Sequence, residues 1–170
     1  MRFIRKVIDS KWPDYYQEGE DIQANCLNDL RITENALSIW LIKDDEDALL
    51  VASLLAANAD NDPKAKNRFV VFSDQELKEK NIKFEPRDCG CDIRIGVKNA
   101  KHYDLYDLKL KTVESFAHIV AKKYANHSVI VINKKDILRV LSQSFNNNEF
   151  DIRSIKSDTF RNNILSFKNP

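Results

Sequence analysis

The chain has 170 residues, of which 43% are hydrophobic and 31% are charged, and its formal net charge is +1. This composition is typical of a folded globular protein and excludes the disordered class. Glycine occurs only at Gly19, Gly90 and Gly96. A phosphate-binding loop needs clustered small residues that let its backbone amides approach the anion, so the sequence excludes Rossmann and P-loop nucleotide sites.

The N-terminal residues alternate between charged and apolar side chains. No apolar stretch approaches the roughly 18 residues that a membrane-spanning helix needs. The three cysteines are an odd number, which does not suit a disulfide framework. We therefore expect no signal peptide, no membrane contact, and reduced thiols in a cytoplasmic protein.

The first part of the chain predicts two strands and two helices. Alternation over residues 3–7 indicates a half-exposed strand at a sheet edge, where basic side chains discourage pairing. A mostly irregular segment follows, with a short helix expected over 22–30. Residues 36–42 are apolar on both faces and predict a central strand. The carboxylates of 44–47 then open a helix with an apolar stripe of helical spacing.

The rest of the chain continues to alternate helices and strands. Residues 69–72 predict a buried strand, joined to the strand at 36–42 by a right-handed parallel crossover. The remaining expected elements are a short helix at 73–80, a hairpin of strands at 82–84 and 93–97, a helix ending near Tyr124, a strand at 129–132, a helix at 137–145 and a last short helix at 160–167.

These elements predict one α/β domain over residues 1–170, with a mixed sheet of about five strands and helices packed on it. A polar C-terminal tail is expected from about residue 150. The three apolar strands should be central in the sheet, with Trp40 and Val131 buried.

Charge is unevenly distributed along the chain. Residues 1–62 carry 6 basic and 13 acidic side chains, whereas residues 63–170 carry 21 basic and 13 acidic side chains. This asymmetry predicts an electrostatically two-sided molecule that associates with a charged partner in a set orientation, unless the two halves interleave in space.

Aromatic and acidic side chains gather near the N-terminus. Aromatic anchors within a charged rim are typical of protein interfaces. The alternative is that the aromatic rings cover one end of the core. The predicted partner-binding residues are Trp12, Tyr15, Tyr16, Glu18, Glu20 and Asp21.

His102 is the candidate for catalysis. It begins a polar tetrapeptide before a long helix, and with Asp104 or Asp107 it could act as a general base near neutral pH. The alternative is a loop that caps the following helix, because no nucleophile or oxyanion donor can be assigned beside it. His118 shares a helical face with charged residues and is expected to face water.

Three patterns resemble metal or nuclease sites but have simpler explanations. The acidic run 44–47 could hold magnesium, yet it also caps a helix. The three cysteines with His102 could bind zinc, but one residue between two cysteines is not the usual spacing. The tripeptide at 76–78 matches a nuclease motif that belongs on a strand, whereas here it begins a helix. We expect no metal and no cofactor.

Lysines are plentiful in the second half and could contact nucleic-acid phosphates. Acidic residues interrupt them and no binding motif frames them, so a solvated surface is the simpler interpretation. The basic residues concerned are Lys98, Lys101, Lys109, Lys111, Lys122, Lys123, Lys134, Lys135 and Arg139.

Short motifs stand in the first third of the chain and once later: Lys11-Trp12, Glu18-Gly19, Leu27, Asp29-Leu30-Arg31, Asn35, Leu37-Ser38-Ile39-Trp40, Asp44-Asp45 and His102-Tyr103-Asp104-Leu105. With these motifs the chain resembles a group of uncharacterised bacterial proteins of similar length. The resemblance implies a bacterial origin and a single compact domain, and it carries over no catalytic residue.

The sequence favours a non-enzymatic protein-interaction module, of the bacterial immunity or antitoxin type, that binds a protein partner. The absence of catalytic signatures, the charge asymmetry and the aromatic, acidic N-terminal segment support this interpretation. One alternative is a small enzyme or ligand-binding domain that uses His102 with Asp104 or Asp107. The other is a nucleic-acid-binding accessory factor that uses the basic half.

Overall fold

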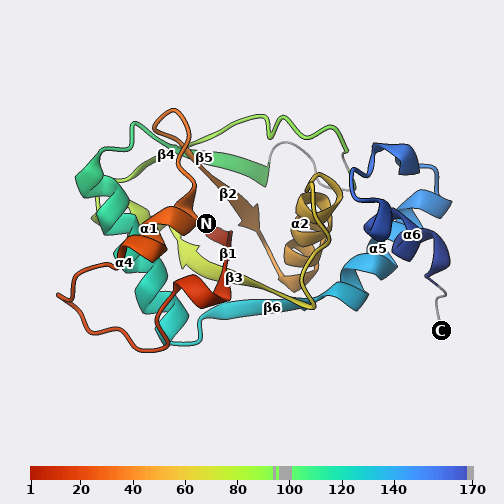
Figure 1. The fold of residues 1–170 in the computed structure, drawn as a ribbon. Helices are drawn as coiled ribbons and strands as arrows, with labels where there is room; N and C mark the ends of the chain where they lie inside the picture. Colours follow the sequence, from red (N-terminus) through yellow and green to blue (C-terminus); the bar gives the residue numbers. More distant parts are fainter. Residues whose placement is uncertain (94, 96–100, 168–170) are drawn as a thin grey trace. The chain divides into compact units, whose positions relative to one another are not determined.

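The computed structural model describes residues 1–93, 95 and 101–167 (Figure 1). None of the helices in this part of the chain combines the length and the apolar character needed to cross a membrane. The elements are β1 (Arg2–Val7), η1 (Asp9–Lys11), α1 (Ala24–Leu30), β2 (Leu37–Ile42), α2 (Asp45–Ala57), β3 (Lys66–Ser73), α3 (Asp74–Glu79), β4 (Lys83–Pro86), β5 (His102–Tyr106), α4 (Leu110–Ala125), β6 (Val129–Asn133), α5 (Lys134–Asn146), η3 (Ile152–Ser154) and α6 (Asp158–Ser166).

The chain forms two compact units. The first unit comprises residues 1–43, 68–89 and 99–130, and the second comprises 44–67, 90–98 and 131–170. Both contain segments that are far apart in the sequence. The described helices and strands alternate, so the α/β class is confirmed.

The sheet has six strands in the order β4-β5-β2-β1-β3-β6. β1 pairs antiparallel with both β2 and β3, and β5 pairs antiparallel with β2 and β4. The prediction of a mixed sheet is therefore wrong. β2 and β3 do run in the same direction, as a crossover requires, but β1 lies between them. Sequence periodicity detects strands and does not determine which strand is inserted between two others.

β1 is an interior strand and not the predicted edge strand. Its residues Phe3 and Ile4 are fully buried. Arg5, in the same strand, donates hydrogen bonds to the backbone carbonyls of Ser38 at 2.7 Å and Leu30 at 2.5 Å. A guanidinium bound to carbonyl oxygens can lie inside a fold, so its presence in the strand did not indicate an edge.

β6 lies at the edge of the sheet, although its apolar sequence predicted a central strand. Val131 is 42% exposed, whereas Trp40 in β2 is 4% exposed. The burial prediction is correct for Trp40 and wrong for Val131. A fully apolar run is compatible with burial on both faces but does not require it, and in β6 only Ile132 is buried.

The predicted hairpin and the predicted polar loop at His102 also need correction. β4 pairs with β5, through register partners such as Phe84 and Leu105, so residues 102–105 form a strand. Part of the expected strand at 93–97, namely 94, 96 and 97, lies outside the described residues. Ile93 and Ile95 are buried but are not in a strand.

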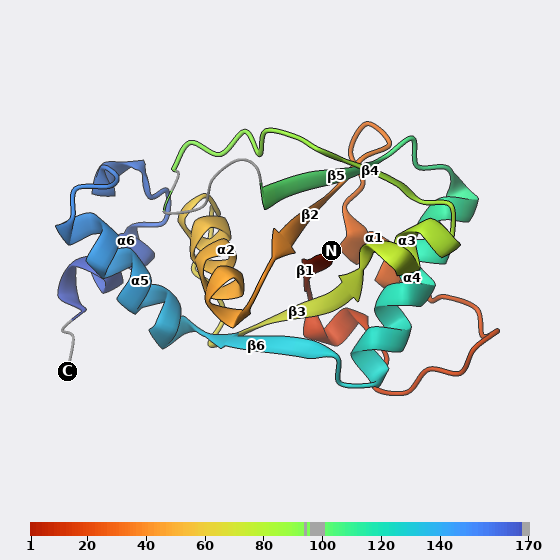
Figure 2. The same cartoon turned by 180° about the vertical axis from the view of Figure 1, so that it is seen from behind.

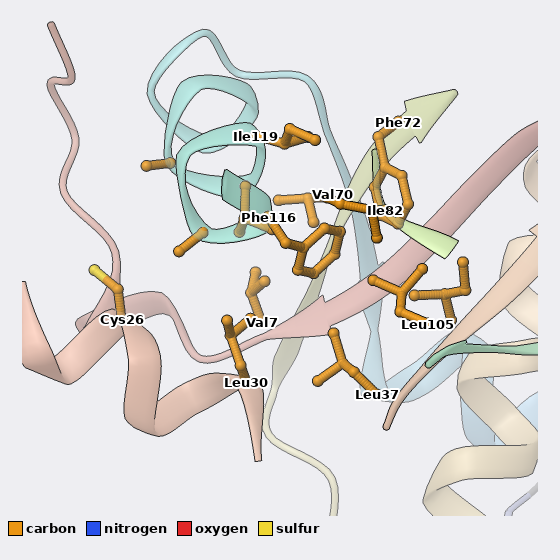
Figure 3. Close-up of a cluster of buried hydrophobic side chains, with 14 of the residues drawn as sticks. Val7, Cys26, Leu30, Leu37, Val70, Phe72, Ile82, Leu105, Phe116 and Ile119 are labelled. Atoms are coloured by element: carbon orange, nitrogen blue, oxygen red, sulfur yellow. The ribbon is translucent and has the colours of Figure 1, made fainter. Parts of the chain in front are cut away.

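The core of the first unit lies between the sheet and helices α1, α3 and α4 (Figure 2). Phe116 of α4 contacts Phe72 of β3 edge to face, with ring centroids 5.3 Å apart. Figure 3 shows Phe116 directed into this cluster, with Leu30 of α1 also contributing. Phe3 lies at the centre of an aromatic group, and its ring centroid is 5.2 Å from that of Tyr103 and 5.5 Å from that of Phe84.

The second unit is helical, with α5 in contact with both α2 and α6. Asp44 caps α2, because its side chain accepts the Asp47 amide at 2.9 Å. Asp62 joins two segments by accepting from Lys134 at 2.9 Å and from Ser157 at 3.1 Å. The expected helix near the C-terminus is present as α6, and it contributes Phe160 to the buried residues.

Replacing Phe3 with alanine should lower the free energy of unfolding by about 3–5 kcal/mol, because it removes a buried ring and leaves a cavity among aromatic neighbours. Tyr15 is 69% exposed and serves as the control. Tyr15→Ala should change stability by less than about 0.5 kcal/mol. Urea unfolding measures both variants, and equal effects would contradict the interior position of β1.

Candidate functional site

A pocket of about 460 Å³, here called the acidic pocket, lies in the first unit. Three segments form it: the N-terminal loop, the C-terminal half of α3 with the residue after it, and the middle of α4. Six carboxylates and two lysines are among the side chains around it. The lining residues are Tyr16, Glu18, Gly19, Glu20, Asp21, Glu76, Glu79, Lys80, Glu114, Ser115, His118, Ile119 and Lys122.

The N-terminal loop is held against α4 by polar contacts. The hydroxyl of Tyr16 and Nδ1 of His118 share a hydrogen bond of 2.7 Å. Glu18 lies 3.7 Å from the Lys122 ammonium. Gly19 adopts φ +94, a conformation that favours glycine, and turns the loop at the pocket wall. Burial raises the pKa of Tyr16, and Glu18 adds to the effect, so Tyr16 stays neutral at physiological pH.

The start of this loop is anchored to α1 and α4. Trp12 is 5% exposed and donates its indole Nε1 to the buried carboxylate of Asp29 at 2.6 Å. Asp9 accepts the hydroxyl of Tyr124 and pairs with Arg68 at 2.7 Å. These contacts fix where the loop leaves the core and therefore where its acidic side chains lie.

Most carboxylates of the acidic pocket have no cationic partner. Partial burial favours a higher pKa for Glu76, but its 2.8 Å ion pair with Lys123 and the Ser73 amide together hold the pKa below its usual value. Glu18 and Glu76 are thus in ion pairs, whereas Glu20, Asp21, Glu79 and Glu114 have no cationic partner among the residues that the structure describes. The pocket therefore has an excess of negative charge directed at solvent.

Four of the six predicted partner-binding residues line the acidic pocket: Tyr16, Glu18, Glu20 and Asp21. Tyr15 does not line the pocket and is 69% exposed. Trp12 is buried and bonded to Asp29, so it has almost no surface for a partner to contact. Substituting Trp12 would test the fold, whereas substituting Tyr16 would test the pocket.

The sequence did not identify His118 or the end of α3 as parts of a site. His118 was expected to face water, yet it is half-buried beneath the ring of Tyr16, with centroids 5.8 Å apart. Its spacing from Glu114 and Lys122, four residues on each side, was correctly interpreted as one helical face. The missing information was the contact between two residues 102 positions apart.

His102 and Asp104 lie together on β5, with Nε2 and Oδ1 3.6 Å apart. His102 is 4% exposed, and its Nδ1 lies 3.0 Å from the Arg87 carbonyl. Ser38 donates to Asp104 at 3.3 Å, so the carboxylate stands between the hydroxyl and the imidazole. In a nucleophilic triad the imidazole must touch the hydroxyl, so this order does not activate Ser38.

Asp107 is separated from the His102 pair. It forms an ion pair of 2.7 Å with Lys83, and the hydrogen bond from that ammonium lowers the pKa of Asp107 below its usual value. The structure thus brings together one of the two predicted histidine–carboxylate pairs.

Several residues of the patterns considered for metals make structural contacts in the described part of the chain. There, no group of three or more histidine, cysteine or carboxylate side chains is arranged to hold a metal ion. The tripeptide at 76–78 lies on α3, where Ser73 and Glu76 form a capping box. Cys26 is buried and donates to the Lys11 carbonyl at 3.0 Å, and burial raises the pKa of its thiol.

The basic residues of the second half are largely paired with acidic ones. In the first unit Lys122 meets Glu18 and Lys123 meets Glu76. In the second unit Lys134 meets Asp62 at 2.9 Å and Lys156 meets Asp60 at 3.0 Å. Within each unit, therefore, basic and acidic segments interleave. Lys98 lies outside the described residues.

Comparisons of the chain with protein-family models, with curated proteins and with solved structures found no match.

The contact between Tyr124 and Asp9 predicts a distinct alkaline behaviour. Burial and the bond to Asp9 raise the pKa of Tyr124 from 10.0 to about 12. The pKa of Tyr124 is thus higher in the folded protein than in the unfolded chain. Its contribution to the free energy of unfolding is complete below pH 10 and is lost as pH rises toward 12. Tyr124→Phe should cost about 1 kcal/mol at neutral pH but less at pH 12. Urea unfolding across this range measures it, and a pH-independent difference would contradict the contact.

Proposed function

We propose that the protein is a non-enzymatic protein-interaction module whose acidic pocket binds a positively charged segment of a partner protein. We further propose that it acts as a bacterial inhibitor of the immunity or antitoxin type. The observation that carries the proposal is the group of unpaired carboxylates, Glu20, Asp21, Glu79 and Glu114, around one pocket beside the ring of Tyr16.

The physical reason is charge complementarity. Four carboxylates without a cationic partner around one pocket make a negative surface, which a lysine or arginine side chain of a partner complements. Complementary charge mainly raises the association rate and selects among partners. Tyr16 supplies a flat ring, fixed by His118, against which a guanidinium can stack. A fixed aromatic side chain loses little entropy on binding and suits an interface anchor.

Fewer observations support the two alternatives, an enzyme or ligand-binding domain and a nucleic-acid-binding factor. His102 is 4% exposed, which leaves little room for a substrate to reach its imidazole. Three of the lysines that a nucleic-acid interface would use, Lys122, Lys123 and Lys134, are in ion pairs within their own unit. Lys111 and Lys135 are exposed and have no acidic partner in the described part of the chain, and they are the best residues with which to test that alternative.

A triple variant tests the electrostatic part of the proposal. Glu20→Gln, Glu79→Gln and Glu114→Gln together should slow association with the partner, which we expect to be the product of a neighbouring gene. The effect should shrink as salt rises, because exposed charges are screened over about 8–10 Å. The control variant carries Glu46→Gln, Glu85→Gln and Glu149→Gln, which changes net charge equally at residues that do not line the pocket. Stopped-flow association rates distinguish the two.

The ring of Tyr16 is tested separately. Tyr16→Ala should weaken the complex by about 2 kcal/mol or more in calorimetry, whereas Tyr16→Phe keeps the ring and should retain most of the affinity. Wild-type protein should also neutralise the toxicity of the partner when both are co-expressed. A complex that tolerates every pocket substitution, yet is lost when Lys111 and Lys135 are changed to glutamate, would show that the acidic pocket is not the binding surface.

A further inference from the structure

A second pocket, of about 420 Å³, contains three arginines from three different segments of the first unit. Arg5 comes from β1, Arg31 follows α1, and Arg87 follows β4. Ser38, Glu34 and Asp104 also line this pocket. Its residues are distinct from those of the acidic pocket, so the inference below does not depend on the proposed function.

Arg5 forms a fixed part of this pocket. Its two terminal nitrogens bond to the carbonyls of Leu30 and Ser38, and its Nε is buried without a hydrogen-bond partner among the described residues. A guanidinium has five N–H donors, so Arg5 has donors to spare. Burial lowers the pKa of Arg5 to about 10; Asp29 opposes the shift, and the positive charge of Arg31 adds to it. Two like charges therefore lie close together at this site.

Arg31 and Arg87 are the accessible cations. Arg31 is exposed and has no acidic partner in the described part of the chain. Its φ of 48 is the left-handed conformation of the residue that ends α1, so the position of Arg31 is fixed by the end of that helix. One terminal nitrogen of Arg87 forms an ion pair with Asp104 at 3.2 Å, and the Arg87 side chain is 57% exposed.

We propose that this arginine pocket binds a small phosphate monoester, with Arg31 and Arg87 contacting the phosphate and Arg5 fixing the wall behind it. Guanidinium groups match the oxygen geometry of phosphate better than lysines do. Three arginines and two carboxylates line the pocket, which leaves one net positive charge, and Asp29 outside the lining offsets part of the charge of Arg5. The pocket exceeds the volume of a phosphate ion, so it has space for the organic part of the ester, whose hydroxyl groups can donate to Glu34.

Isothermal titration of the full-length protein with glycerol 3-phosphate and adenosine monophosphate tests the proposal, with inorganic phosphate and citrate as comparison ligands. At least one ester should bind with a dissociation constant in the millimolar range or tighter, and more tightly than either comparison ligand. No binding of either ester would overturn the proposal. Equal binding of citrate would overturn the phosphate assignment, and equal binding of inorganic phosphate would overturn recognition of the ester.

Substitutions locate the site. Arg31→Gln should weaken ester binding about tenfold or more, because it removes a charge-assisted fork, and Arg31→Lys should restore part of the affinity by returning the charge. Arg153→Gln is the control, since Arg153 is exposed in the second unit and pairs with Asp151. Circular dichroism verifies that each variant folds. An Arg31→Gln variant that binds the ester as tightly as the wild type would overturn the assignment.

Discussion

The carboxylate of Asp29 is 6% exposed, and it accepts hydrogen bonds from the Ile8 amide at 2.8 Å and the Trp12 indole at 2.6 Å. These bonds fix how the chain leaves β1 and begins the loop that lines the acidic pocket. The negative charge also favours the protonated form of Arg5, the buried guanidinium of the arginine pocket. Without Asp29, the Ile8 amide and the buried Trp12 indole would lose their acceptor and Arg5 would lose a counter-charge, so both pockets depend on it.

Elements with strong local signals could be predicted from the sequence. Asp44 and the apolar stripe behind it correctly predicted α2, and the apolar residues around Trp40 correctly predicted β2. Strand order could not be predicted, because it depends on contacts between distant segments. The alternating charges predicted that β1 lies at an edge of the sheet. β1 is an interior strand, and its Arg5 is accommodated there because it donates to the carbonyls of Leu30 and Ser38. β6 was placed at the centre because an apolar run does not reveal how many of its faces are covered.

The candidate site was predictable only where its residues are close in sequence. Glu18, Glu20 and Asp21 were recognised as a group with Tyr16, and all four line one pocket. The half of the pocket formed by α3 and α4 was missed, because nothing in the sequence links Tyr16 to His118. Trp12 was wrongly predicted to lie at an interface. It is buried in the core, where its indole donates to Asp29. Composition identifies candidate side chains, and the fold determines which are exposed.

NMR spectroscopy of the full-length protein tests the acidic pocket most directly. Amide signals are followed while a short arginine-rich peptide is added, with a peptide carrying glutamate in place of arginine as the control. We predict saturable shifts confined to Tyr16–Asp21, the end of α3 and the part of α4 around His118, and weaker shifts at high salt. Shifts of equal size near Glu46, Glu85 and Glu149, or no saturable shift at Tyr16 and His118, would contradict specific recognition by this pocket.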